Sequence, residues 1–179
     1  MIPIPGWLIA FLTFPGIIVH EIAHRFFCDL RNVPVYEVSY FNFSRTPGYV
    51  IHGPINDLPS AFLISVGPLI INSLLCVIFT FSSFIPLVAL GLGLRDAHWF
   101  SIVLMWFGIS IGMHAFPSPH DANNFKELVK LHKKGFLLKT VSWIFVIIIS
   151  IAHVLRVIWF DLLYAIGLSW VLPLLLGIV

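Results

Sequence analysis

Residues 7–27 read WLIAFLTFPGIIVHEIAHRFF, an apolar run that carries a compact group of two histidines and one glutamate. A helix needs about 20 apolar residues to cross the hydrocarbon core of a bilayer, so this run is long enough to span it. Ionisable groups inside such a run are costly and are typical of functional sites. The stretch therefore predicts a membrane helix whose chemistry is carried by His20-Glu21-Ile22-Ala23-His24.

The rest of the chain is just as apolar. Of its 179 residues 59% are hydrophobic and 10% are charged, and the mean hydropathy is +1.01. A soluble domain carries about 25% charged residues, so lipid must be part of the solvent of this protein. The formal net charge is +2, and no basic stripe with interleaved aromatic residues occurs, which argues against a nucleic-acid partner.

Five apolar runs predict an all-α polytopic membrane protein with about five transmembrane helices, over residues 7–27, 59–81, 98–116, 140–160 and 162–179. Gly167 and Pro173 break the last run, so a full crossing and a partly buried segment both stay open. No change in composition divides the chain, and we expect a single membrane domain over residues 1–179.

Two stretches are less apolar. Residues 31–58 hold aromatic and β-branched residues on both sides of Arg45-Thr46-Pro47-Gly48, which predicts a short β-hairpin. Residues 120–134 are rich in lysine and predict an amphipathic surface helix. Basic residues gather after the first and third runs, so the positive-inside rule places the hairpin and the surface helix in the cytoplasm, most simply at the cell membrane.

The histidine pair has the spacing of a metal site. On a helix, His20 and His24 return to nearly the same face and can reach one ion. Zinc suits imidazole and carboxylate ligands, and Glu21 lies beside the pair, where it can act as a general base. The pattern predicts one Zn²⁺ per chain and a zinc hydrolase. The alternative is a helix end whose polar residues face the headgroups.

A third protein ligand is needed, and the polar stretch of residues 114–124 is the best candidate region. Prolines end the third run there, on the same side of the membrane as His24. Asp121 is the expected third ligand. It could instead cap the helix that follows, and both roles can hold at once. His114 and His120 are rival ligands or outer-sphere groups.

Three blocks of the sequence resemble the site-2 proteases, a family of intramembrane zinc metalloproteases. His20 to His24 resembles the zinc-binding helix of that family, residues 67–72 (GPLIIN) its Gly-Pro-Leu-x-Asn stretch, and residues 119–122 (PHDA) its Pro-Leu-Asp-Gly block. The resemblance covers residues 7–125 and implies a three-helix catalytic core there. The apolar runs predict additional transmembrane helices in residues 140–179. It implies zinc ligands at His20, His24 and Asp121, and Glu21 as general base.

The chain also departs from the family pattern. Asn72 comes one residue later than the family's asparagine, so it is either an active-site residue or a helix-packing residue. Ala122 stands in place of glycine, and Met113 occupies the place of a family asparagine. His114, next to Met113, is the expected substitute in stabilising the transition state.

The resemblance implies that the substrate is a transmembrane segment of a protein or peptide, cleaved in or near the bilayer. The hairpin could then hold unwound substrate along residues 35–43 or 48–53, or be an ordinary cytoplasmic loop. Two other functions fit the same residues: a metal-binding membrane protein without hydrolysis, such as a transporter or sensor, and an inactive adaptor. The oligomeric state stays open.

Overall fold

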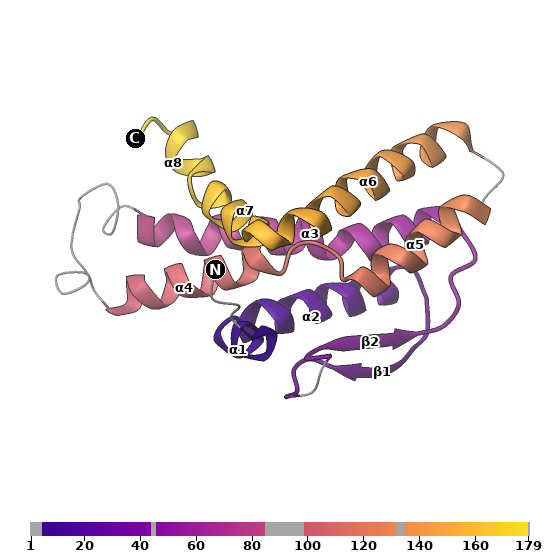
Figure 1. Ribbon diagram of the computed structural model, residues 1–179, viewed down its shortest axis with the longest axis horizontal. Coiled ribbons are helices and arrows are strands. Elements are labelled where there is room, and N and C mark those ends of the chain that lie inside the picture. The colour runs from indigo at the N-terminus through magenta and orange to yellow at the C-terminus, as the bar shows by residue number, and fades with distance from the viewer. Residues whose placement is uncertain (1–4, 44–45, 85–98, 132–134, 179) are drawn as a thin grey trace.

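A computed structural model describes residues 5–43, 46–84, 99–131 and 135–178 of the chain (Figure 1). Its elements in chain order are α1 (Gly6–Leu12), α2 (Phe14–Leu30), β1 (Val35–Ser39), β2 (Tyr49–His52), α3 (Leu58–Phe84), α4 (Trp99–Met113), α5 (Pro119–Leu131), α6 (Phe136–Leu155), the 3₁₀ turn η2 (Arg156–Ile158), α7 (Phe160–Ser169) and α8 (Val171–Leu175).

Helices α2, α3 and α4 pack against one another and form the centre of the molecule (Figure 1). Small residues allow close approach: a Cβ atom on Gly16 of α2 would lie 2.0 Å from the carbonyl oxygen of Ser110 on α4. Ser110 also accepts a hydrogen bond of 3.0 Å from the Gly16 backbone N–H. Such contacts between small residues are typical of helices that associate in lipid.

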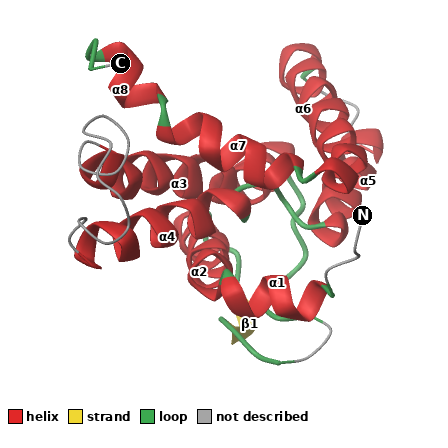
Figure 2. Cartoon of the chain, turned by 60° about the vertical axis from the view of Figure 1, so that its left-hand side comes forward, coloured by secondary structure: helices red, strands yellow, loops and turns green. Residues whose placement is uncertain are grey.

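The predicted first membrane helix is bent. Its two parts, α1 and α2, meet at Thr13 at an angle of 81°. Figure 2 shows α1 running across the view while α2 is seen nearly end-on. Pro15, at the start of α2, has no N–H to continue the hydrogen-bond ladder. Side chains of α4 satisfy the carbonyls freed by the bend, because Trp106 donates to Leu12 O at 2.9 Å and Ser110 donates to Thr13 O at 2.9 Å.

Two described helices are long and apolar enough to cross a membrane, Leu58–Ser83 and Phe136–Ile158, and the bent pair α1–α2 makes a third if it is one span. The prediction of five spans is therefore not supported. The run at 98–116 forms only the 15 residues of α4, and the run at 162–179 falls into the short helices α7 and α8. A helix of 15 residues is about 22 Å long, less than the roughly 30 Å of the hydrocarbon core.

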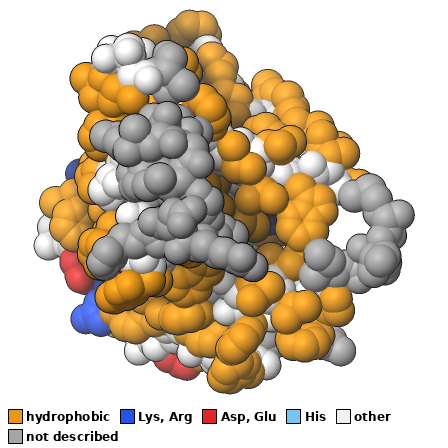
Figure 3. Space-filling model, turned by 90° about the vertical axis from the view of Figure 1, so that its left-hand side faces the viewer, with side chains coloured by type: hydrophobic (Ala, Val, Ile, Leu, Met, Phe, Trp, Pro, Cys, Tyr) orange, Lys and Arg blue, Asp and Glu red, His pale blue; other side chains and the backbone are white. Residues whose placement is uncertain are grey.

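The surface of the described residues suits lipid. Figure 3 shows one end of the molecule, where hydrophobic side chains cover most of the described surface and few charged ones appear. Along α6 the outward residues Ile144, Ile147, Ile151 and Val154 are between 53% and 72% exposed. Exposed aliphatic side chains at helical spacing on a long apolar helix are compatible with membrane association.

The predicted hairpin is confirmed, as an antiparallel pair of β1 and β2 with Val38 opposite Val50. An irregularity between Val35 and Glu37 shortens the regular pairing. Phe41 and Phe43, which were expected within the first strand, lie beyond β1, and Phe41 packs on Phe14 with ring centroids 5.7 Å apart. In the predicted turn, Arg45 lies outside the described residues.

The predicted surface helix is confirmed as α5 as far as Leu131, and residues 132–134 of the predicted helix lie outside the described residues. Its apolar face buries Phe125 and Val129 against Leu58 of α3 and Val146 of α6. Because α5 follows the connection from α4, this packing fixes the position of its first turn, where Asp121 lies. The fold thus brings the first turn of α5 to the polar face of α2.

Candidate metal centre

One face of α2 carries the polar cluster. His20, Glu21 and His24 are 7%, 8% and 5% exposed, so all three are buried in a protein with an apolar surface. The rings of His20 and His24 lie with their centroids 4.8 Å apart and their planes at 72°. This is the arrangement expected from the helical period, because residues four positions apart return to nearly the same face.

Asp121 completes the cluster from α5. Ligand atoms of His20, His24 and Asp121 all lie within 4.8 Å of one another. His24 Nε2 is 3.3 Å from Asp121 Oδ2. Tetrahedral zinc with bonds of about 2.0–2.2 Å separates its ligand atoms by about 3.3–3.6 Å, so closure on an ion needs only small movements. The expectation that these three residues converge is confirmed as geometry.

Asp121 also takes part in the cap of α5, so the capping role considered for it is confirmed. Ser118 is the residue before the helix, and its hydroxyl donates to Asp121 Oδ2 at 2.5 Å. The Asp121 backbone N–H donates to Ser118 Oγ, and the Ser118 N–H donates to Asp121 Oδ2, both at 3.2 Å. This reciprocal pattern is a capping box. Burial alone would raise the pKa of Asp121, but His24 and Ser118 hold that pKa below its usual range.

His20 is oriented by a backbone carbonyl. Its Nδ1 lies 2.6 Å from the carbonyl oxygen of His114. A carbonyl oxygen only accepts, so Nδ1 carries the proton and Nε2 is the nitrogen left to offer a lone pair to an ion. Metal-ligating histidines commonly use their second nitrogen in this way, which fixes the tautomer and the ring orientation.

Asn72 of α3 fixes that carbonyl in turn. It is fully buried, and its Nδ2 donates to His114 O at 3.0 Å and to Ile111 O at 3.2 Å. These carbonyls belong to the last turn of α4 and the residue after it, where helical partners end. Asn72 therefore acts on the cluster through the His114 carbonyl, and it also packs the helices together.

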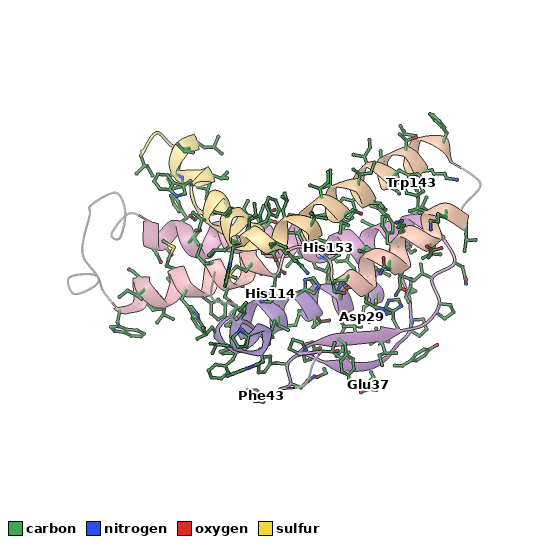
Figure 4. The ribbon with its side chains drawn as sticks, viewed as in Figure 1. Asp29, Glu37, Phe43, His114, Trp143 and His153 are labelled. Atoms are coloured by element: carbon green, nitrogen blue, oxygen red, sulfur yellow. The ribbon has the colours of Figure 1, made fainter. Side chains whose placement is uncertain are left out.

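The rivals of Asp121, His114 and His120, lie beside the cluster but outside the group of converging ligands. Thr13 Oγ1 donates to Ile9 O at 2.7 Å, so in its 2.8 Å contact with His114 Nε2 it must accept, and that nitrogen carries a proton. His114 thus ties the connection after α4 to the bend at Thr13 (Figure 4). His120 is paired with Asn124 at 3.2 Å. Neither belongs to the group of converging ligand atoms found among the described residues.

One further observation supports the binding of a metal ion by His20, His24 and Asp121. His24 Nε2 is buried and makes no hydrogen bond, because its 3.3 Å contact with Asp121 is close but poorly aligned. A buried nitrogen without a partner costs roughly 1–3 kcal/mol. An ion held between His20, His24 and Asp121 would satisfy it. The residues present therefore could hold a metal ion.

Two cavities, of about 290 and 400 Å³, meet at Glu21. Both are lined by Glu21, Thr46, Gly48 and Ser118. The segment before β2 lies directly over the glutamate, since a Cβ atom on Gly48 would be 2.8 Å from Glu21 Cγ. The smaller cavity also reaches His20 and the larger one reaches His24 and Asp121. Glu21 thus faces space on both sides of the segment.

Sequence reasoning assigned no role to several residues of these cavities, among them Ser118, which lines both. His52 of β2 lines the larger cavity, and Arg156, at the end of α6, lines the smaller one. The signal for Arg156 was present, because an ionisable residue within an apolar run is typical of function. His52 gave no comparable signal in a hairpin of mixed polarity.

Comparison of the chain with models of protein families, with curated proteins and with solved structures finds no match.

Proposed function

We propose that this protein is an intramembrane zinc metalloprotease that hydrolyses peptide bonds in or near transmembrane segments of other membrane proteins. The observation that supports it best is the convergence of His20, His24 and Asp121 within 4.8 Å beside the buried Glu21. Two imidazoles with one carboxylate, leaving one position open, are the ligand set of catalytic zinc. The resemblance of residues 7–125 to site-2 proteases points to the same chemistry.

Zinc supplies Lewis acidity at such a site, which makes water nucleophilic and polarises a carbonyl group. Glu21 is not among the converging ligands, so its carboxylate is left to accept the proton of the attacking water. It then returns that proton to the leaving amine. The Nδ1–H of His20, bound to the His114 carbonyl, keeps the His20 ring in place through both steps.

An extended substrate fits the two cavities on either side of Glu21. Tyr49, Val50 and His52 of β2 line the larger cavity, which favours residues 48–53 over 35–43 as the edge for strand addition. Membrane association through α3, α6 and the bent pair α1–α2 brings a transmembrane substrate close to the site. The lysines of α5 favour a cytoplasmic position for the hairpin and for the entry of water.

Metal content is the first test. Protein purified without chelator should hold about one zinc ion, lost in His20→Ala and Asp121→Ala. Two variants serve as matched controls, His120→Ala and Asp29→Ala, because neither residue belongs to the converging group. Folded wild type without metal would refute the proposal. Retention in Asp121→Ala together with loss in His120→Ala would move the third ligand to His120.

Hydrolysis is tested separately with Glu21→Gln. This variant should keep its zinc and cleave transmembrane peptides about 10²–10⁴-fold more slowly than wild type, because it lacks the general base. Zinc in both proteins with cleavage in neither would instead favour a metal transporter or sensor, which zinc uptake into proteoliposomes would reveal.

A further inference from the structure

Arg156 lies where α6 ends. The helix closes at Leu155, η2 follows, and Trp159 adopts a φ of 61° before α7 begins at Phe160. A tryptophan in the left-handed region is uncommon, and such conformations cluster at functional sites. The chain therefore changes direction in η2, directly after α6, where Arg156 reaches the cavity beside Glu21.

The cavity that Arg156 lines is the smaller one, of about 290 Å³, which also holds His20 and Glu21. Within its described lining, Arg156 is the sole lysine or arginine. Ile17, Phe116 and Pro119 supply apolar walls. A guanidinium stays charged at all physiological pH values, and apolar walls strengthen its attraction for an anion.

Two contacts fix the chain around Arg156, one from His153 and one from Arg156 itself. His153, one turn earlier on α6, lies with Nε2 2.9 Å from the carbonyl oxygen of Pro117, next to Ser118 (Figure 4). Arg156 Nε lies 2.9 Å from Asp161 Oδ2 of α7. That ion pair is close but poorly aligned, since Arg156 Nε and Asp161 Oδ1 both lack a hydrogen bond. The Arg156 side chain is 34% exposed, so a ligand can reach some of the five N–H donors of its guanidinium.

We propose that Arg156 binds a carboxylate group of the substrate and thereby sets which peptides are cleaved. This inference rests on the proposed protease function, and it names the chemistry of one substrate subsite. A guanidinium binds a carboxylate through two parallel hydrogen bonds, which gives both affinity and orientation. The carboxylate is either an acidic side chain close to the scissile bond or the C-terminal carboxylate of the peptide.

Asp161 is then a competitor as well as a support. The Asp161 carboxylate contacts part of the Arg156 guanidinium in the absence of substrate. Replacing Asp161 by Asn gives a neutral amide, which should leave Arg156 more available to a substrate carboxylate. If the ion pair were purely structural, the opposite result would be expected, because loss of either partner would then destabilise the protein to a similar extent. The two variants Arg156→Gln and Asp161→Asn therefore separate a binding role from a structural one.

The experiment measures peptide binding in the Glu21→Gln background, so that nothing is cleaved. The probes are fluorescent apolar peptides of about 20 residues in detergent micelles. One series carries a single Glu at successive positions with an amidated C-terminus, and its partner carries Gln. A third peptide has Gln and a free C-terminal carboxylate. Lys130→Gln is the matched control, since it removes the same charge from an ion pair outside the cavity.

The best Glu peptide, or the peptide with a free C-terminus, should bind about tenfold or more tightly than its neutral partner. The peptide that shows this increase in affinity identifies the source of the carboxylate, either a side chain or the C-terminus. Arg156→Gln should abolish the difference in affinity between the charged and neutral peptides, Lys130→Gln should keep that difference, and Asp161→Asn should enlarge it. Arg156→Lys should retain part of it, because it keeps the charge without the fork.

Equal binding of charged and neutral peptides by the unaltered site would overturn the proposal, and so would equal losses in Arg156→Gln and Asp161→Asn. The outcome is separable from that of the proposed function, because binding needs no hydrolysis. A carboxylate preference in a protein that holds no zinc would refute the protease while keeping this subsite.

Discussion

Replacing Ser118 by alanine tests whether the cap of α5 holds a metal ligand. The substitution removes the hydroxyl that donates to Asp121 Oδ2 at 2.5 Å and accepts from the Asp121 N–H at 3.2 Å. Loss of an N-cap costs about 1 kcal/mol. Loss of a partner of a metal ligand lowers metal affinity by about 10–100-fold. We therefore expect Ser118→Ala to bind zinc at least tenfold more weakly, which is about 1.4 kcal/mol.

The assay is a zinc competition titration with a chromophoric chelator, combined with thermal unfolding in the same detergent. Ser118→Thr keeps a hydroxyl at the cap and should recover most of the affinity. Ser82→Ala is the matched control, because Ser82 is exposed and its hydroxyl donates to the carbonyl of Phe79 on its own helix, away from the cluster. Unchanged zinc affinity in Ser118→Ala, with α5 intact, would refute the link between the cap and the metal.

Three further outcomes are expected. Gly48→Ala should slow cleavage by about 10–100-fold with zinc retained, because its Cβ would lie 2.8 Å from Glu21 Cγ and a small misplacement of a catalytic group is costly. Gly167→Ala is the control and should cleave at the wild-type rate, because Gly167 has open space around it. Asn72→Leu should lower stability by about 1–2 kcal/mol and weaken zinc binding in the competition titration, because the carbonyl of His114 loses its amide partner. Removing zinc with a chelator should lower the melting temperature, since zinc at a hundredfold its Kd adds about 2.7 kcal/mol to stability.

The candidate site was largely predictable from local rules. The helical period alone brings His20 and His24 together, and the glutamate between them needs no tertiary information. Asp121 was predictable because prolines end the third apolar run and a cap must begin the next helix. What sequence reasoning could not give was the partner of each ring nitrogen, since the carbonyl of His114 and the amide of Asn72 come from other helices.

The number of spans was predicted less well, for a physical reason. Hydropathy over a window measures how apolar a segment is, and it does not register where the hydrogen-bond ladder breaks. The bend of 81° at Thr13 divides an apolar run that looks continuous in composition, and the run at 162–179 is divided between α7 and α8. The bend at Thr13 is held by contacts distant in sequence, such as the 2.9 Å bond from Trp106 to Leu12 O.

The bend at Thr13 places polar groups where an unbroken membrane helix would not. A straight helix through Thr13 would keep its carbonyls within the ladder and offer none to Ser110, and His114 would lose the hydroxyl that accepts from its Nε2. Among the described residues near the cluster, His24 Nε2 and the Asn72 side-chain oxygen are buried atoms without a hydrogen-bond partner. Among the converging ligands, His24 Nε2 lies 3.3 Å from Asp121 Oδ2 without forming a hydrogen bond, and a metal ion held between the two side chains could bind both.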